Sequence, residues 1–142
     1  PDGKVIVVAH STGFSRPNEH ELEAEYLDRI ERGGGVVVTA AHAFSGVNRA
    51  VRKKLNTFQI DEIIAYTLRI FGEGMKVTAE IALMAADAGY VRVDEPIIAM
   101  AGTGSGSDTA VMLIPAYSQS FFEMKILEVL CMPAPAHPLF QK

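Results

Sequence analysis

The glycine-rich segment over residues 102–109 is the strongest candidate for a binding function. It reads Gly-Thr-Gly-Ser-Gly-Ser-Asp-Thr, and backbone amides beside glycines can converge on an anion because no Cβ blocks its approach. It is not the dinucleotide fingerprint, because Ser107 follows the third glycine and a predicted strand rather than a helix comes next. Two interpretations stay open, a phosphate or polar-ligand loop and a plain connection between strands. Asp108 is equally open, since it can accept hydrogen bonds from ligand hydroxyls or close an Asx turn.

Two histidines, His10 and His42, could exchange protons with a ligand. Imidazole titrates near neutral pH, and each of these residues directly follows a predicted buried strand. Neither has a carboxylate close by in the sequence, and loop histidines are common, so a ligand contact and a purely structural place both remain open. The four histidines and the single cysteine show no metal-ligand spacing, and no nucleophile motif is present.

A basic stretch over residues 49–54 follows the second histidine. It favours a solvated helix face, because cations are stabilised near the negative end of a helix dipole. The alternative is an anion clamp reached by Arg49, one helical turn beyond Ser45. Further along, Lys76 and Glu80 have the i,i+4 spacing of a structural ion pair.

Two apolar runs flank an amphipathic segment and predict a βαβ unit. Residues 5–9 (VIVVA) and 35–39 (GVVVT) are typical of strands that are buried on both faces of a parallel sheet. Asn18 is a good N-cap and Glu21 is placed for a capping box, so we expect a helix that starts there and ends at Gly33. Parallel pairing with a right-handed crossover follows as the default.

The rest of the chain divides into a block of helices and a block of strands. Apolar periodicity predicts helices over 45–55, 59–71 and 75–88, and strands over 96–101, 110–114 and 125–132. Open α/β sheets bind ligands at the carboxyl ends of their strands. This rule selects three segments as the rim of one crevice, which are 10–14, 41–46 and 102–109.

The composition bounds the class of protein. The 142 residues are 49% hydrophobic, carry a net charge of −4 and include one cysteine. This excludes a largely disordered chain and an internal disulfide framework, and it argues against a general binder of nucleic acid or membrane surfaces. We expect a cytoplasmic protein with a single α/β domain over residues 1–133 and a proline-rich tail over 134–142.

Several short motifs occur in a fixed order along the chain. They are His42-Ala-Phe-Ser-Gly46, Glu80-Ile-Ala-Leu-Met-Ala-Ala-Asp-Ala-Gly89, Gly102-Thr-Gly-Ser-Gly-Ser-Asp-Thr-Ala110, Pro115-Ala116, Phe121-Phe122, Glu128 and Cys131-Met-Pro133. In this order they resemble a family of small stand-alone microbial proteins described as pyruvate kinase alpha/beta-domain-like, whose fold is similar to the carboxy-terminal domain of pyruvate kinase. The resemblance covers nearly all of residues 5–133.

The resemblance implies a doubly wound α/β fold with a mainly parallel sheet flanked by helices. Relative to the family, the first strand–helix repeats are expected to be missing from this sequence. Pyruvate kinase activity is not implied, because that chemistry belongs to a barrel domain. Family members often carry basic or imidazole groups where this chain has Ser105, Ile114 and Tyr117.

The resemblance also implies a crevice for a phosphate-bearing ligand, since stand-alone relatives look like flavin mononucleotide (FMN) binders. We expect loop amides and hydroxyls to hold the phosphate, and the ring system to lie near His42 and Phe14. The expected contacts, which include Arg49 from the clamp interpretation, are Thr12, Gly13, Phe14, His42, Ser45, Gly46, Arg49, Gly102, Thr103, Gly104, Ser105, Gly106, Asp108 and Thr109.

A second function remains open at this point. The chain could be a structural or regulatory module that associates with copies of itself, since an unpaired sheet edge favours association. A homo-oligomer is expected in either case. A flavin-dependent activity is conceivable, whereas a hydrolase that uses His10 or His42 lacks a visible nucleophile.

Overall fold

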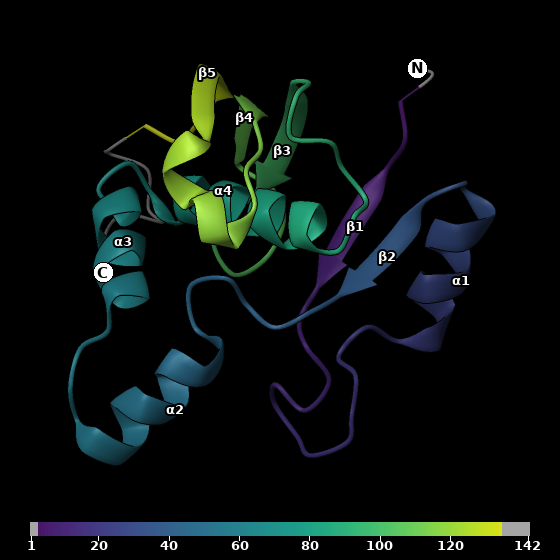
Figure 1. Cartoon of the computed structure of the whole chain (residues 1–142). Helices are drawn as coiled ribbons and strands as arrows, with labels where there is room; N and C mark the ends of the chain where they lie inside the picture. Colours follow the sequence, from purple (N-terminus) through teal and green to yellow (C-terminus); the bar gives the residue numbers. More distant parts are fainter. Residues whose placement is uncertain (1–2, 135–142) are drawn as a thin grey trace.

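A computed structural model describes residues 3–134 of the chain. Its first unit is strand β1 (Ile6–Ala9), helix α1 (Ala24–Arg32) and strand β2 (Val36–Thr39), and the two strands pair in parallel. The predicted βαβ unit is therefore confirmed. The prediction that these strands are buried on both faces is wrong, because Val38 is the one buried residue in the pair. Helix α1 buries none of its own residues and lies to one side of β2, so it covers the pair only partly (Figure 1).

Helix α1 begins later than the sequence predicts. Asn18 lies in a loop with φ at +65°, and Glu23 is the N-cap. Glu21 does not close a capping box. Its carboxylate instead accepts a hydrogen bond from the Ser15 hydroxyl and contacts Nδ1 of the His10 ring. The predicted cap at Asn18 does not form, because Ser15 and His10 contact the Glu21 carboxylate that the capping box needs.

Three helices follow β2 and confirm the three predicted ones. They are α2 (Gly46–Leu55), α3 (Ile60–Arg69) and α4 (Glu73–Asp87), and α4 crosses the middle of the molecule (Figure 1). Helix α3 starts with a capping box in which the Gln59 N–H donates to the Glu62 carboxylate over 3.0 Å. Gln59 is therefore the N-cap of α3.

The three remaining strands form a separate antiparallel sheet in the order β3–β4–β5. Strand β3 is Ile97–Ala101, β4 is Thr109–Ile114 and β5 is Lys125–Cys131, with the short 3₁₀ helix η1 (Ser118–Glu123) before β5. Residues 3–134 thus form a mixed α/β structure whose parallel pairing is confined to β1 and β2. The larger sheet is antiparallel because residues 102–108 join β3 to β4 without the helix that a parallel crossover requires.

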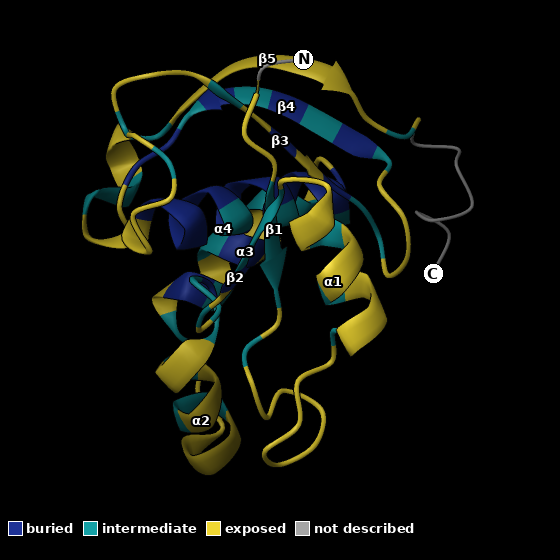
Figure 2. Ribbon diagram, turned by 90° about the vertical axis from the view of Figure 1, so that its right-hand side faces the viewer, coloured by how far each residue is buried: buried dark blue, intermediate teal, exposed yellow. Residues whose placement is uncertain are grey.

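Helix α4 lies at the centre of the core (Figure 2). One face packs on the antiparallel sheet, in a cluster of Met75, Ala82, Ala99, Val111 and Leu113. A second face packs on α3 and on residues that flank the sheet, in a cluster of Phe44, Ala65, Ala79, Leu83 and Ala116. A helix that is apolar on two faces needs neighbours on both, and this is why α4 ends up between the sheet and α3.

None of the helices within residues 3–134 combines the length and the apolar character that a membrane crossing requires. Most of the predicted tail, residues 135–142, lies outside the described residues.

Candidate ligand-binding site

A cavity of about 430 Å³ opens where β1 and β2 end and α2, α3 and α4 converge. This volume lies in the usual range for small-molecule sites. Both loops that follow the parallel strands contribute to its wall, as the rule for the carboxyl ends of parallel strands predicts. The lining residues are Val8, Ala9, His10, Phe14, His42, Phe44, Ser45, Arg49, Glu62, Ala65, Tyr66, Arg69, Glu73, Lys76, Val77, Glu80, Ile81 and Met84.

Helix α4 supplies the buried charges of the cavity. Lys76 and Glu80 lie one helical turn apart on the face that lines the cavity, and both are buried. Their side chains form an ion pair, so the predicted i,i+4 pair is confirmed. Burying two charges is costly unless their hydrogen bonds are satisfied, so the remaining partners of the carboxylate decide whether the pair is stable.

Glu80 is contacted from its own helix and from the segment that follows β2. The Phe44 N–H donates to Oε1 over 3.1 Å, Lys76 donates to Oε2, and Nδ1 of His42 lies 3.7 Å from Oε1. Burial by itself raises the pKa of this carboxyl. The nearby His42 ring, the Lys76 ammonium and the hydrogen bond from the Phe44 backbone outweigh burial and lower the pKa to about 2. Glu80 is therefore a fixed negative charge at any physiological pH.

His42 has one ring nitrogen toward Glu80 and the other without a partner. Its Nε2 is buried and forms no hydrogen bond within the described residues, although the ring lines the cavity. A ring nitrogen of imidazole donates or accepts according to the tautomer, so Nε2 offers a molecule in the cavity one hydrogen bond of either kind.

Aromatic rings form one wall of the cavity. Phe14 stacks on His42 with centroids 5.0 Å apart and planes at 11°, and on His10 with centroids 4.2 Å apart. The Arg49 guanidinium lies 5.4 Å from the centroid of the Phe14 ring. Glu21 orients His10 from outside the cavity. A flat, partly exposed aromatic wall of this kind suits a planar ring system.

Three cationic side chains line the cavity, and two of them are neutralised. Lys76 pairs with Glu80, and Arg69 pairs with Glu73 through Nε at 2.6 Å and a second nitrogen at 3.0 Å. Arg49 has no carboxylate partner within residues 3–134. It is therefore the cation best placed to meet an anion.

Four of the expected ligand contacts line the cavity, which are Phe14, His42, Ser45 and Arg49. His10, the other histidine that the sequence singled out, lines it as well. The other proposed residues of the first two segments, Thr12, Gly13 and Gly46, are exposed and adjoin the lining residues in the chain without lining the cavity themselves.

The glycine-rich loop lies elsewhere. None of the residues 102–109 lines the cavity. The loop instead contacts the sheet-facing side of α4, where a Cβ on Gly74 would come within 2.1 Å of the Thr109 hydroxyl and 2.7 Å of Asp108. The cavity-facing residues Glu73 and Lys76 project from another side of the same turn, so the first turn of α4 separates the loop from the cavity.

Sequence reasoning missed the contribution of α3. Glu62, Tyr66 and Arg69 all line the cavity. The sequence offers a signal for Arg69 alone, whose i,i+4 spacing from Glu73 predicts the ion pair that holds its side chain. Asp61, on the same helix, is buried with both carboxylate oxygens unpartnered in the part of the chain that the structure describes, but it does not line the cavity.

No known protein-family model matches this chain. Within residues 3–134 no group of three or more histidine, cysteine, aspartate or glutamate side chains is arranged to hold a metal ion.

Proposed function

We propose that the cavity binds a small molecule that combines a planar ring system with a phosphate, and that FMN is such a ligand. The observation that carries the proposal is the buried, unpartnered Nε2 of His42 in the wall of the cavity. A buried polar atom without a partner costs free energy, which a ligand that completes its hydrogen bond would recover.

The ring end of such a ligand fits the aromatic wall. Phe14 and His42 present nearly parallel rings, and Nε2 of His42 can accept a hydrogen bond from a ring N–H. The isoalloxazine of a flavin offers both a flat apolar face and a ring N–H. A bound flavin would supply redox chemistry, whereas the protein groups described here bind and orient it.

The phosphate end fits the start of α2. Ser45 is the N-cap of this helix, its side chain makes no capping hydrogen bond, and the first turn contains no acidic residue. The amides of that turn and the positive end of the helix dipole therefore remain available to an anion. Arg49, in the same turn, adds a charge without a carboxylate partner.

Kinship with the pyruvate kinase alpha/beta-domain-like proteins and their doubly wound fold is part of the same proposal, although the antiparallel β3–β4–β5 sheet departs from the mainly parallel sheet that the resemblance implies. The parallel β1–α1–β2 unit and the position of the cavity beside its strand ends support it. The loop over 102–109 does not line the cavity, so the phosphate-binding role that the resemblance gives it is left out of the proposal.

Titration of the protein with FMN and with riboflavin, followed by quenching of flavin fluorescence, tests the proposal. The wild type should bind FMN more tightly than riboflavin, because riboflavin lacks the phosphate. Arg49→Met should weaken FMN binding about tenfold or more and leave riboflavin binding nearly unchanged, since a charge-assisted hydrogen bond contributes about 1.5–3 kcal/mol. Arg29→Met, an exposed arginine of α1 outside the cavity, is the matched control.

Phe14→Ala distinguishes the contribution of the ring contacts to affinity from that of the phosphate contacts. It should weaken FMN and riboflavin alike, by about fivefold to tenfold, because it removes stacking area that both ligands use. A wild-type protein that quenches neither flavin would overturn the proposal. Equal binding of both flavins would overturn the assignment of the phosphate to α2.

Self-association is the second candidate function, and a different part of the molecule favours it. All seven residues of β5 are exposed although five of them are apolar or cysteine. Such a strand at the edge of a sheet is a typical site of association.

A further inference from the structure

Strand β5 is an edge strand with an apolar surface. It pairs with β4 on one side, and within residues 3–134 no strand pairs with its other side. We propose that this free edge pairs antiparallel with β5 of a second copy of the chain, so that two three-stranded sheets join into one. This goes beyond ligand binding in the cavity and does not depend on it.

The apolar side chains of β5 are exposed to solvent, and a partner strand would cover them. Ile126 and Leu127 are 45% and 47% exposed, and Leu130 is 44% exposed. Strand β5 is coloured as exposed in Figure 2. Val129 and Ile126 stand opposite the fully buried Val111 and Leu113, yet the core that covers β4 does not reach them. Free edges of this kind expose both apolar side chains and unpaired backbone groups, and a second strand covers both.

Two irregularities in the β4–β5 pairing decide which side chains share a face. Lys125 stands opposite Ile114, Glu128 opposite Met112, and Cys131 opposite Ala110. Because alternate residues of β4 point to the same face of the sheet, their partners on β5 do so as well. Lys125 and Glu128 therefore lie on one face although they are three residues apart.

The two charges select both the partner and the register. In an antiparallel pair of β5 strands, one register places Lys125 opposite Glu128 of the second copy, and the two-fold symmetry makes this contact twice. The register centred on Glu128 would instead place two carboxylates opposite each other. Opposite charges stabilise a cross-strand pair and like charges destabilise it, so the first register is favoured. A second copy of this chain is the partner because β5 is complementary to itself.

Sedimentation equilibrium of the full chain and of charge-reversed variants tests this inference. The wild type should be a dimer. Lys125→Glu and Glu128→Lys should each weaken the dimer by about tenfold or more, since each places two pairs of like charges in contact. A mixture of these two variants should restore a mixed dimer, because every contact then joins a glutamate to a lysine.

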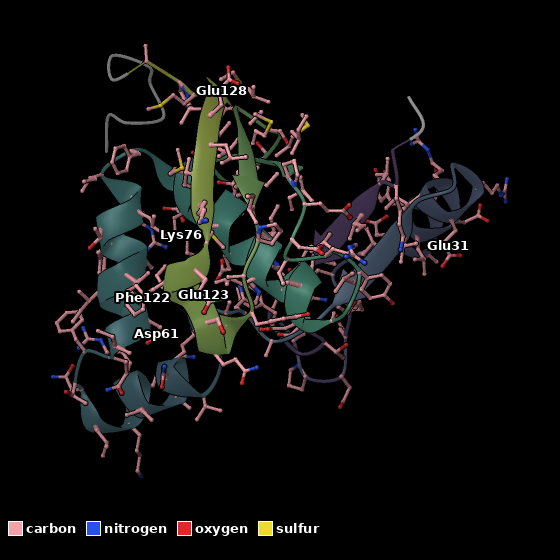
Figure 3. The ribbon with its side chains drawn as sticks, turned by 45° about the horizontal axis from the view of Figure 1, so that its top comes forward. Glu31, Asp61, Lys76, Phe122, Glu123 and Glu128 are labelled. Atoms are coloured by element: carbon pink, nitrogen blue, oxygen red, sulfur yellow. The ribbon has the colours of Figure 1, made fainter. Side chains whose placement is uncertain are left out.

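The mixture also controls for folding, because a variant that had failed to fold would not be rescued by its complement. Glu31→Lys makes the same change of charge on α1, far from Glu128 on β5 (Figure 3), and should leave the dimer intact. A monomeric wild type, or two charge-reversed variants that both stay dimeric, would overturn the proposal. Dissociation of Glu128→Lys alone, without Lys125→Glu, would overturn the register.

Discussion

Two regions of the molecule differ in whether their charged side chains are buried or exposed. Around α4 the charged groups Lys76 and Glu80 are buried within a packed core. In the β1–α1–β2–α2 region neither helix buries a residue, and the charged groups face solvent. The cavity lies between the two, so its floor has the buried Lys76 and Glu80, and its rim has the exposed Phe14 ring and the Arg49 guanidinium, which has no carboxylate partner in the described part of the chain. The comparison indicates that α4 sets the geometry of the site, because its charged groups are fixed by packing.

Two carboxylates that contact a histidine show the same contrast. Glu21 contacts His10 at the surface, where hydrogen bonds from Ser15 and His10 lower its pKa. Glu80 contacts His42 in the core, where its donors must overcome the cost of burial. Solvent screens the first pair, so only the second is expected to contribute strongly to the free energy of unfolding.

The largest expected effect on the free energy of unfolding comes from truncating a buried leucine in the packed region around α4, compared with the same truncation on α1. Leu83→Ala should lower the free energy of unfolding by about 3–5 kcal/mol, because Leu83 is fully buried and leaves a cavity. Leu27→Ala on α1 is the same change at a half-buried site and should cost less than about 2 kcal/mol. Urea denaturation measures both. Equal losses would contradict the division into a packed and a thinly covered region.

Glu80→Gln should cost about 3 kcal/mol at neutral pH. The folded pKa of about 2 lies below the ordinary value of 4.5, so ionised Glu80 stabilises the fold above pH 4.5. This contribution is lost as the pH falls from about 4.5 toward 2. The difference between wild type and Glu80→Gln in urea denaturation should therefore shrink over that range.

Glu21→Gln is the matched control for this pH series. Its side chain is exposed, so the corresponding difference should be much smaller at every pH. A difference between wild type and Glu80→Gln that stays constant down to pH 2 would contradict the assignment of a low pKa to Glu80.

Gly74→Ala should destabilise the protein by about 1–3 kcal/mol, although alanine is the better helix former. The new Cβ would lie 2.6 Å from the Thr109 Cβ and 2.1 Å from its hydroxyl, so α4 and β4 would have to move apart. Thermal denaturation followed by circular dichroism measures the change. An increase in melting temperature would show that this contact between helix and sheet is looser than described.

The smallest effect is expected at the surface of α1. Asp28 and Arg32 form an exposed i,i+4 ion pair, so Asp28→Asn should change the free energy of unfolding by less than about 0.5 kcal/mol. The measurement is the same urea denaturation. A loss comparable to that of Glu80→Gln would mean that burial does not separate the two regions.

The sequence by itself determined most of the helices and strands. The apolar periodicity of 59–71 and 75–88 predicts α3 and α4, and the i,i+4 spacing of Lys76 and Glu80 predicts their pair. These features depend on residues that are close in the chain, so local spacing encodes them. The start of α1 is the exception, because side-chain contacts within the preceding loop compete for Glu21.

Only the tertiary structure decided the cavity, the carboxylate that faces His42, the antiparallel sheet and the place of the glycine-rich loop. Nothing near His42 in the sequence points to Glu80, which reaches it from the middle of another element. The same holds for the loop over 102–109, which contacts Gly74 rather than the rim of the cavity. Contacts between distant segments depend on how the elements pack, and no local pattern of residue types specifies that packing.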